Sequence, residues 1–316
     1  MEGLTGPVWR RLHHQYFGGV DAYYTPFVTP TREPRFTERQ LREVGEAVNA
    51  GLPVVPQLLT RRPEDFCWAA QTLLAMGYPE VNLNLGCPAG TVVAKGKGSG
   101  FLRDPMGLDA FFDAVFTTLP GAPVTVKTRL GWNDEQEFSR LVEIYERHPI
   151  RRLIVHPRLK TDAYKGNARW QVLKQSLAEL TLPLGINGDL VTVDDLAARA
   201  ADFPNAGEIM VGRALIADPA LFRKVRGGPA ASREEVFSFA DDLLLALSDA
   251  FQSQKNAMMR MKEYWFFLQN LFIGTEKPVK SLFKARQLED YQAVVRGMKE
   301  ELPLRKEASM GWYKPL

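Results

Sequence analysis

Residues 82–91 read Asn-Leu-Asn-Leu-Gly-Cys-Pro-Ala-Gly-Thr, and the glycine-rich run Lys-Gly-Lys-Gly-Ser-Gly follows at residues 95–100. The first residues predict a buried strand, and Gly86 and Pro88 predict a tight turn directly after it. That turn presents the thiol of Cys87 at the carboxyl end of the strand. The glycines that follow permit a bulky ligand to approach the backbone closely. This stretch therefore predicts a ligand site at a strand end.

Short apolar runs alternate with amphipathic helical segments up to about residue 225. The candidate strands are residues 22–27, 54–58, 80–85, 124–128, 153–156, 184–187 and 208–211, and helical patterns lie between them at residues 38–50, 63–76, 105–118, 136–147 and 193–201. Seven strand–helix units favour a closed (β/α)8 barrel, a TIM barrel, in which one strand is not visible. The alternative, an open doubly wound sheet, requires a glycine-rich dinucleotide fingerprint after the first strand, and the sequence has none.

The pattern changes near Gly227 and Gly228. Residues 233–252, 256–272 and 288–301 are long helical stretches without strand signals. Gly274 and Pro278 separate the second of these stretches from the third, as residues that end helices do. We therefore predict a barrel domain over residues 1–227 and a small all-α domain over residues 228–316.

The composition, 45% hydrophobic and 24% charged, is typical of a globular protein. With two cysteines, no apolar run of about 18 residues and no signal-like start, we expect a cytoplasmic protein without disulfides, membrane contact or bound metal. The net charge of +3 indicates little by itself. Its distribution favours a polyanionic partner, because residues 255–286 hold seven basic residues and only two acidic ones. The basic residues are Lys255, Arg260, Lys262, Lys277, Lys280, Lys284 and Arg286.

Five motifs, met in order along the chain, resemble those of the tRNA-dihydrouridine synthases. They are the Asn-Leu-Gly-Cys-Pro turn at residues 84–88, the lysine strand at residues 126–132, the histidine segment at residues 155–158, and two turns at residues 186–189 and 210–214. The helical tail resembles the C-terminal domain of that family. The resemblance implies an FMN-dependent monomer that reduces a uridine in tRNA to 5,6-dihydrouridine, with NADPH as the reductant. It leaves open which uridine is modified.

The resemblance also implies a role for each site residue. Cys87 would be the general acid that gives a proton to C5 of uracil, since a thiol with an unperturbed pKa of about 8.5 is protonated near neutrality. Lys127 and Gln57 would meet the pyrimidine edge of the flavin. The whole FMN site would comprise Met1, Glu2, Gln57, Lys127, His156, Asn187, Gly188, Asp189, Gly212 and Arg213, the last five around the phosphate. Uracil would be held by Asn84, Arg129 and Tyr164, and the RNA by Arg260 and Lys262.

The first strand of the family carries roughly Ala-Pro-Met-x-Gly, and Met1-Glu2-Gly3 stands inside that motif. The resemblance thus implies that the first strand lies upstream of this chain, or that another segment or a partner fills its place. An unfilled seam would expose edge strands and part of the barrel core.

Two other functions stay open from the sequence. A flavin-barrel dehydrogenase of the dihydroorotate type would act on a free pyrimidine and would not need the basic helical tail. The other is a flavin-binding or RNA-binding protein without catalysis, and the presence of Cys87 together with Lys127 and His156 argues against it.

Overall fold

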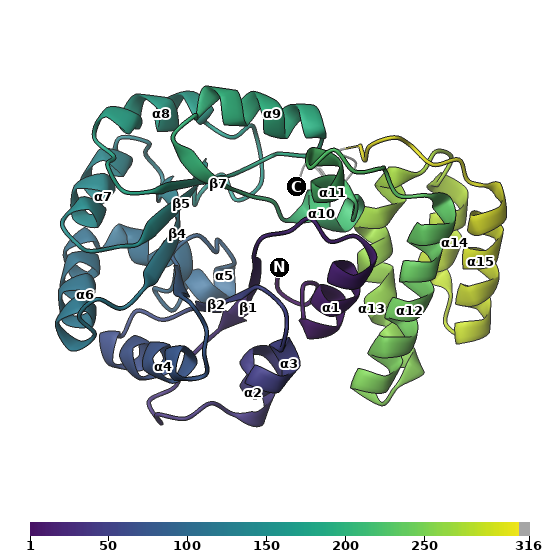
Figure 1. Cartoon of the computed structure of the whole chain (residues 1–316), viewed down its shortest axis with the longest axis horizontal. Coiled ribbons are helices and arrows are strands. Elements are labelled where there is room, and N and C mark those ends of the chain that lie inside the picture. The colour runs from purple at the N-terminus through teal and green to yellow at the C-terminus, as the bar shows by residue number, and fades with distance from the viewer. Residues whose placement is uncertain (310–316) are drawn as a thin grey trace. The chain divides into compact units, whose positions relative to one another are not determined.

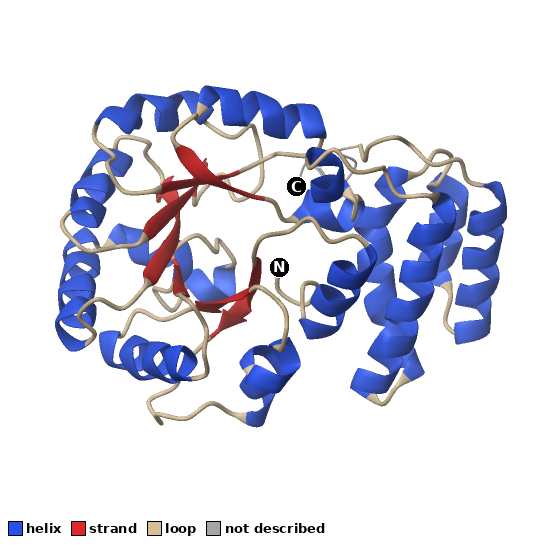
Figure 2. Ribbon diagram, viewed as in Figure 1, coloured by secondary structure: helices blue, strands red, loops and turns tan. Residues whose placement is uncertain are grey.

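Seven strands form one sheet in sequence order, each hydrogen-bonded to the next. They are β1 (Tyr23–Val28), β2 (Val54–Leu58), β3 (Val81–Asn84), β4 (Val124–Gly131), β5 (Arg152–Leu159), β6 (Leu184–Asn187) and β7 (Ala206–Met210). In this computed structural model, which describes residues 1–309, the pairs from β2 to β7 are all parallel. The sheet curls, with α4, α6, α7 and α8 on its outer side (Figures 1 and 2). The predicted TIM-barrel class is confirmed, and no strand precedes β1 in residues 1–309.

Helices and short turns connect the strands. They are α2 (Glu38–Val44), α3 (Glu46–Asn49), α4 (Pro63–Ala75), α5 (Gly90–Val93), η1 (Gly98–Arg103), α6 (Pro105–Thr118), α7 (Glu137–Glu146), α8 (Trp170–Gln175), η2 (Ser176–Ala178) and α9 (Val193–Asp202). The single helix predicted over residues 38–50 is wrong at one point, because it breaks at Gly45. The backbone there is extended, and a Cβ on Gly45 would lie 2.6 Å from the carbonyl oxygen of Leu41.

The strand register collects polar side chains on one face of the sheet. Asn82 pairs with Gln57 on β2 and with Thr125 on β4, and Arg129 on β4 pairs with His156 on β5. Because side chains alternate along a strand and register partners point the same way, the inner face carries a polar set. That set is Gln57, Asn82, Asn84, Thr125, Lys127, Arg129, Arg152, His156 and Arg158. The alternate residues are apolar and pack in the core under the helices: Val81, Leu83, Val124, Val126, Leu153 and Val155.

The helical part comprises α1 (Pro7–Tyr16), α10 (Arg213–Ala217), α11 (Leu221–Val225), α12 (Arg233–Phe251), α13 (Gln254–Leu268), η3 (Gln269–Leu271), α14 (Glu276–Lys284) and α15 (Leu288–Glu301). Ser232 and Ser253 cap α12 and α13 by accepting backbone N–H bonds, which fixes where these helices begin. Trp265 is fully buried, with ring centroids 5.7 Å from Phe237 and 6.2 Å from Phe272. The all-α character predicted for this region is confirmed. No described helix is long and apolar enough to cross a bilayer.

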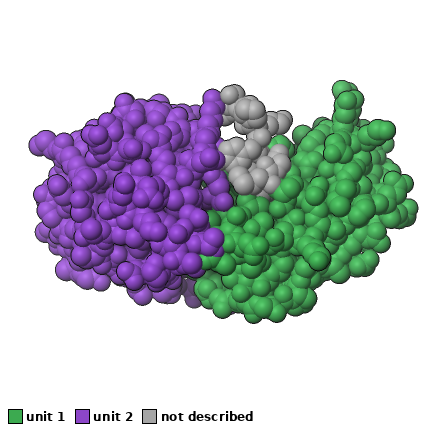
Figure 3. All heavy atoms as spheres, turned by 90° about the horizontal axis from the view of Figure 1, so that it is seen from above, with its two compact units in different colours: residues 1–23, 190–197, 211–316 green, residues 24–189, 198–210 purple. Residues whose placement is uncertain are grey.

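The chain divides into two units (Figure 3). One comprises residues 24–189 and 198–210 and holds almost the whole sheet. The other comprises residues 1–23, 190–197 and the chain from residue 211 onward. The domain boundary predicted after residue 227 stays a prediction, and this grouping places residues 211–227 with the helices.

Candidate functional site

The Cys87 turn follows β3 and is fixed from both sides. The side-chain oxygen of Asn84 accepts the backbone N–H groups of Gly86 at 3.0 Å and Cys87 at 2.9 Å. The carbonyl oxygen of Cys87 accepts two bonds from Ser99, from its backbone N–H at 3.1 Å and from its hydroxyl at 2.9 Å. Gly98 has a φ of +55°, and a Cβ there would lie 2.8 Å from that carbonyl. At this position the loop requires glycine because it packs on the Cys87 turn.

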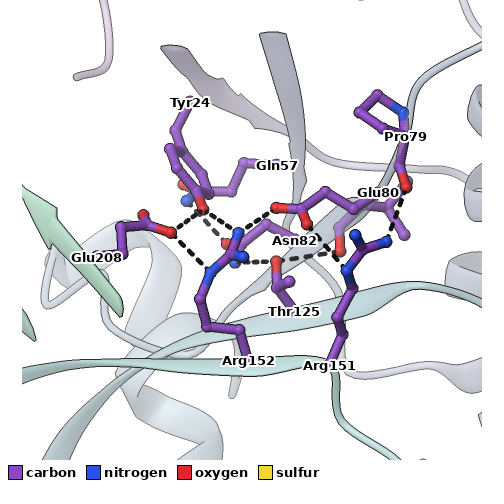
Figure 4. Close-up of polar contacts among 10 residues, drawn as sticks. Tyr24, Gln57, Pro79, Glu80, Asn82, Thr125, Arg151, Arg152 and Glu208 are labelled. Atoms are coloured by element: carbon purple, nitrogen blue, oxygen red, sulfur yellow. Dashed lines mark hydrogen bonds and ion pairs between the residues drawn. The ribbon is translucent and has the colours of Figure 1, made fainter. Parts of the chain in front are cut away.

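A chain of hydrogen-bonded side-chain amides also supports the Cys87 turn, through Asn84. Asn84 donates to Gln57 at 2.7 Å, Gln57 donates to Asn82 at 3.0 Å, and Asn82 donates to the hydroxyl of Thr125 at 2.9 Å. Figure 4 shows the last two of these bonds. Asn84, predicted to hold uracil, therefore also orients Gln57 and the Cys87 backbone. The sequence prediction left out Asn82, although its place two residues before Asn84 puts both on one face of β3.

Lys127 lies on β4 in register with Asn84, and the residue is partly buried while its ammonium group is enclosed by protein. Burial, followed by the neighbouring Arg129, lowers the pKa of Lys127 to about 7, and the proximity of Cys87 opposes this shift. No carboxylate of residues 1–309 lies within ion-pair distance of Lys127. A buried ammonium without a carboxylate is costly, so the position suits an anionic or electron-rich ligand.

Arg129, two residues further along β4, joins two loops. Its Nε donates to the carbonyl of Gly86 at 2.8 Å, and its Nη1 donates to the carbonyls of Leu159 at 2.9 Å and Ala163 at 2.8 Å. Ala163 adopts a φ of +51°, and the exposed ring of Tyr164 lies 5.4 Å from the guanidinium. Arg129 is 1% exposed. Arg129, predicted to contact uracil, therefore also supports the Cys87 turn and the loop that carries Tyr164.

His156 and Asp189 meet at a third residue, Arg158. Its Nη1 donates to Nε2 of His156 at 3.0 Å and to Asp189 at 2.9 Å, and its Nη2 bonds the second carboxylate oxygen of Asp189. The carboxylate of Asp189 is paired with a buried guanidinium, and the predicted place of its backbone at the flavin phosphate stays a prediction. Arg158 was not among the predicted site residues. Its spacing from His156 on a buried strand was the available signal, because residues two apart share a face.

The other two residues of the predicted phosphate turn after β6 also have internal contacts. Asn187 donates to the carbonyl of Met210 at 2.8 Å and so joins β6 to β7. Gly188 lies against the ring of Trp170, where a Cβ would not fit. A phosphate at this turn would therefore be bound by backbone N–H groups.

Four predicted cofactor residues lie in the helical unit. Gly212 directly precedes α10, and Arg213 is its first residue. The side chain of Met1 lies next to Gly212, since a Cβ there would be 3.5 Å from the Met1 sulfur. Glu2 is exposed. The structure therefore brings Met1 together with the Gly212–Arg213 turn, and the cofactor roles stay predictions.

The two predicted RNA residues on α13 differ in their surroundings. Lys262 is 8% exposed and donates to the carbonyls of Phe283 at 3.2 Å and Ala285 at 2.5 Å, at the C-terminal end of α14. This is a helix-capping contact and speaks against the predicted RNA contact, because the ammonium points into the unit. Arg260 pairs with Glu263 at 2.6 Å and stays at the surface.

A second polar cluster lies at the amino ends of the strands (Figure 4). Arg152 on β5 bonds Glu80 at 2.5 Å, Glu208 on β7 at 2.6 Å and the hydroxyl of Tyr24 on β1 at 3.1 Å. Tyr24 in turn donates to Glu208 at 3.3 Å. This cluster links the first and last strands of the sheet across the barrel interior, and its place at the amino ends of the strands indicates a role in stability rather than chemistry.

No group of three or more His, Cys, Asp or Glu side chains within residues 1–309 is placed to hold a metal ion. The chemistry available at the carboxyl ends of β2 to β5 rests on the thiol of Cys87, the amides of Gln57 and Asn84, the imidazole of His156 and the three basic side chains Lys127, Arg129 and Arg158. The fold and this inner-face site define an α/β-barrel protein with its candidate active site at the strand ends. Residues 1–309 match the family model described as dihydrouridine synthase, and the chain belongs to that family.

Curated relatives are similar over most of the chain. It is 33% identical to the probable tRNA-dihydrouridine synthase 1 of Synechocystis over 228 residues, which cover 71% of this chain and 62% of that protein. It is 30% identical to the tRNA-dihydrouridine(16) synthase of Pseudomonas putida over 280 residues, 84% of each chain. Among solved structures, morphinone reductase matches with a TM-score of 0.50 at 15% identity, covering 73% of this chain and 84% of that one, a likeness of fold.

Proposed function

We propose that this protein is an FMN-dependent tRNA-dihydrouridine synthase that reduces a uridine in tRNA to 5,6-dihydrouridine, with NADPH as the reductant. Family membership and the names of its relatives support the reaction. The observation that carries the proposal is the Cys87 thiol held beside Lys127, a buried cation without a carboxylate partner in residues 1–309.

The inner face fits a flavin. Reduced flavin carries negative charge at its pyrimidine edge, and Lys127 would compensate that charge while Gln57, oriented by two amide bonds, contacts the same edge. His156 would contact the cofactor further along, and the backbone N–H groups of the turn at Gly188 would meet its phosphate. When bound, the cofactor supplies the hydride that reaches C6 of uracil.

Cys87 completes the reduction. Its S–H bond breaks and a C–H bond forms at C5 as the electron pair of the enolate-like uracil takes up the proton, so hydride and proton add across the C5–C6 bond. Asn84 and Arg129 hold the turn that aims the thiol. Tyr164, which is 48% exposed, would contact the base.

The uracil must leave its stack to reach this face, so the protein has to grip the surrounding RNA. Helix α14 offers the better surface. Lys277, Lys280 and Lys284 are exposed and lie three and four residues apart, hence on one face, while Val279 and Leu282 are buried opposite. We propose that these three lysines, together with Arg260, replace Lys262 as the phosphate contacts.

Replacing Cys87 with Ala tests the proposal. The variant should keep its flavin absorbance and lose at least about 100-fold of dihydrouridine formation, the usual worth of a general acid, measured by mass spectrometry of tRNA. Cys67→Ala is the matched control, because Cys67 is a core residue whose thiol pKa is raised by burial. Full activity of Cys87→Ala would sink the mechanism. Equal activity of wild type on free uridine would favour the free-pyrimidine dehydrogenase.

A further inference from the structure

Arg158 is the most deeply buried charge on the inner face. Its side chain has no solvent exposure, and it donates to Asp189, to the carbonyl of Gly166 at 2.5 Å and to Nε2 of His156 at 3.0 Å. Guanidinium groups have five N–H donors and no acceptor. The bond to His156 therefore has one possible direction, and Nε2 must be the acceptor.

This direction determines the protonation of the histidine ring. An imidazole nitrogen that accepts a hydrogen bond carries no hydrogen, so the ring hydrogen of His156 lies on Nδ1. A doubly protonated ring would direct an N–H at the guanidinium and add a second positive charge 3.0 Å from the first. Three further groups face this pair: Asp189, which neutralises Arg158, Tyr164 at 6.5 Å between ring centroids, and Arg129 as the register partner on β4.

The ion pair with Asp189 holds the Arg158 guanidinium in the orientation that reaches His156. Both carboxylate oxygens of Asp189 bond the guanidinium, which fixes the plane of the fork, and the same Nη1 reaches the histidine. A lysine would supply a single point of charge and could not reproduce the fork.

We propose that Arg158 is a positioning residue that fixes His156 in the neutral Nδ1–H tautomer, so that His156 meets its ligand as a hydrogen-bond donor. The ligand atom that accepts this hydrogen bond is then a carbonyl oxygen, a ring nitrogen or a phosphate oxygen, and not an N–H group. The tautomer assignment concerns this chain alone. The statement about the ligand rests on the proposed flavin function.

The test is a long-range proton–nitrogen NMR spectrum of the full chain labelled with 15N-histidine, with the His156 signals identified by their loss in His156→Gln. The wild type should show Nε2 as the unprotonated nitrogen. In Arg158→Met/Asp189→Asn, which removes both charges together, the two tautomers should mix. Arg169→Met is the matched control, since Arg169 lies in the segment between β5 and α8 and pairs instead with Asp162 at 2.9 Å and Glu135 at 3.0 Å.

A protonated Nε2 in the wild type, or an unchanged spectrum in the double variant, would overturn the proposal. The wild-type spectrum decides the matter even where the double variant does not fold. Flavin affinity should fall about tenfold in the double variant and stay unchanged in Arg169→Met, as expected for one lost hydrogen bond. A shifted tautomer with unchanged affinity would refute the link to the ligand. Absence of flavin binding by the wild type would refute the proposed function and leave the tautomer assignment intact.

Discussion

The Nε of Arg129 donates a 2.8 Å hydrogen bond to the carbonyl of Gly86, the residue directly before Cys87. The same guanidinium holds the carbonyls of Leu159 and Ala163, so one side chain sets the geometry of the turn that carries the thiol and of the loop that carries Tyr164. Residues on three separate segments are thus coupled through a single buried cation.

Arg129→Lys should therefore impair catalysis without removing charge. A lysine cannot reach three carbonyls from one planar fork, and displacement of a reacting group by about 1 Å costs on the order of 100-fold in rate. We expect a loss of that size in kcat for dihydrouridine formation, with the flavin retained. Arg151→Lys, at a half-exposed arginine before β5, is the control. A variant that changes only KM would show that Arg129 acts solely in substrate binding.

Lys127 predicts a pH dependence of stability in the flavin-free chain. Its pKa is about 7 when folded against 10.5 as the ordinary value. Below pH 7 both states carry the ammonium, and the folded state bears the full cost of its burial. Between pH 7 and 10.5 the unfolded state binds more protons, so stability rises with pH, by up to about 1.4 kcal/mol per unit. The free energy of unfolding of Lys127→Met, measured with urea, should exceed that of the wild type most below pH 7. A difference that is constant from pH 6 to 9 would contradict this account.

Arg152 predicts a stability effect separate from catalysis. Arg152→Met leaves Glu208 without its cation, and leaves Glu80 with only the longer 3.6 Å pair to Arg151, in a largely enclosed cluster (Figure 4). Removing one partner of such a network costs about 3 kcal/mol. Chemical denaturation should show this loss, and Arg147→Met, at an arginine whose side chain is 59% exposed, should cost less than about 1 kcal/mol. Equal costs for the two variants would mean that the cluster adds nothing beyond a surface pair.

Helix α14 predicts the salt dependence of tRNA binding. Replacing Lys277, Lys280 and Lys284 with Gln should reduce the slope of log K against log salt by about one unit per lysine, if each neutralises one phosphate. Lys262→Met should lower the melting temperature, because the cap on α14 is lost, and leave that slope unchanged. The reverse pattern would restore Lys262 as an RNA contact and remove α14 from the interface.

Several elements could be predicted from sequence because local patterns decide them. Strands β2 and β6 and helices α6 and α15 have the predicted bounds, since apolar alternation, Pro105 at a helix start and the capping side chain of Asp104 act over a few residues. The five motifs that indicated the family are likewise short local runs, read in order along the chain. Helix α1 was not predicted from the sequence. It carries the buried His13, whose pKa burial lowers to about 3, so that the ring is neutral.

The sequence by itself determined the barrel class, the all-α tail and the presence of a thiol, a lysine and a histidine at strand ends. Only the tertiary structure decided which partners those groups have. Parallel pairing sets His156 beside Arg129, and the turn after β6 brings Asp189 to Arg158, across 31 positions of sequence. Burial then gives each contact its consequence, because a cation or carboxylate removed from water must find an opposite charge or a hydrogen-bond acceptor. Periodicity cannot supply that information, since it reports the face of a strand and not what lies against it.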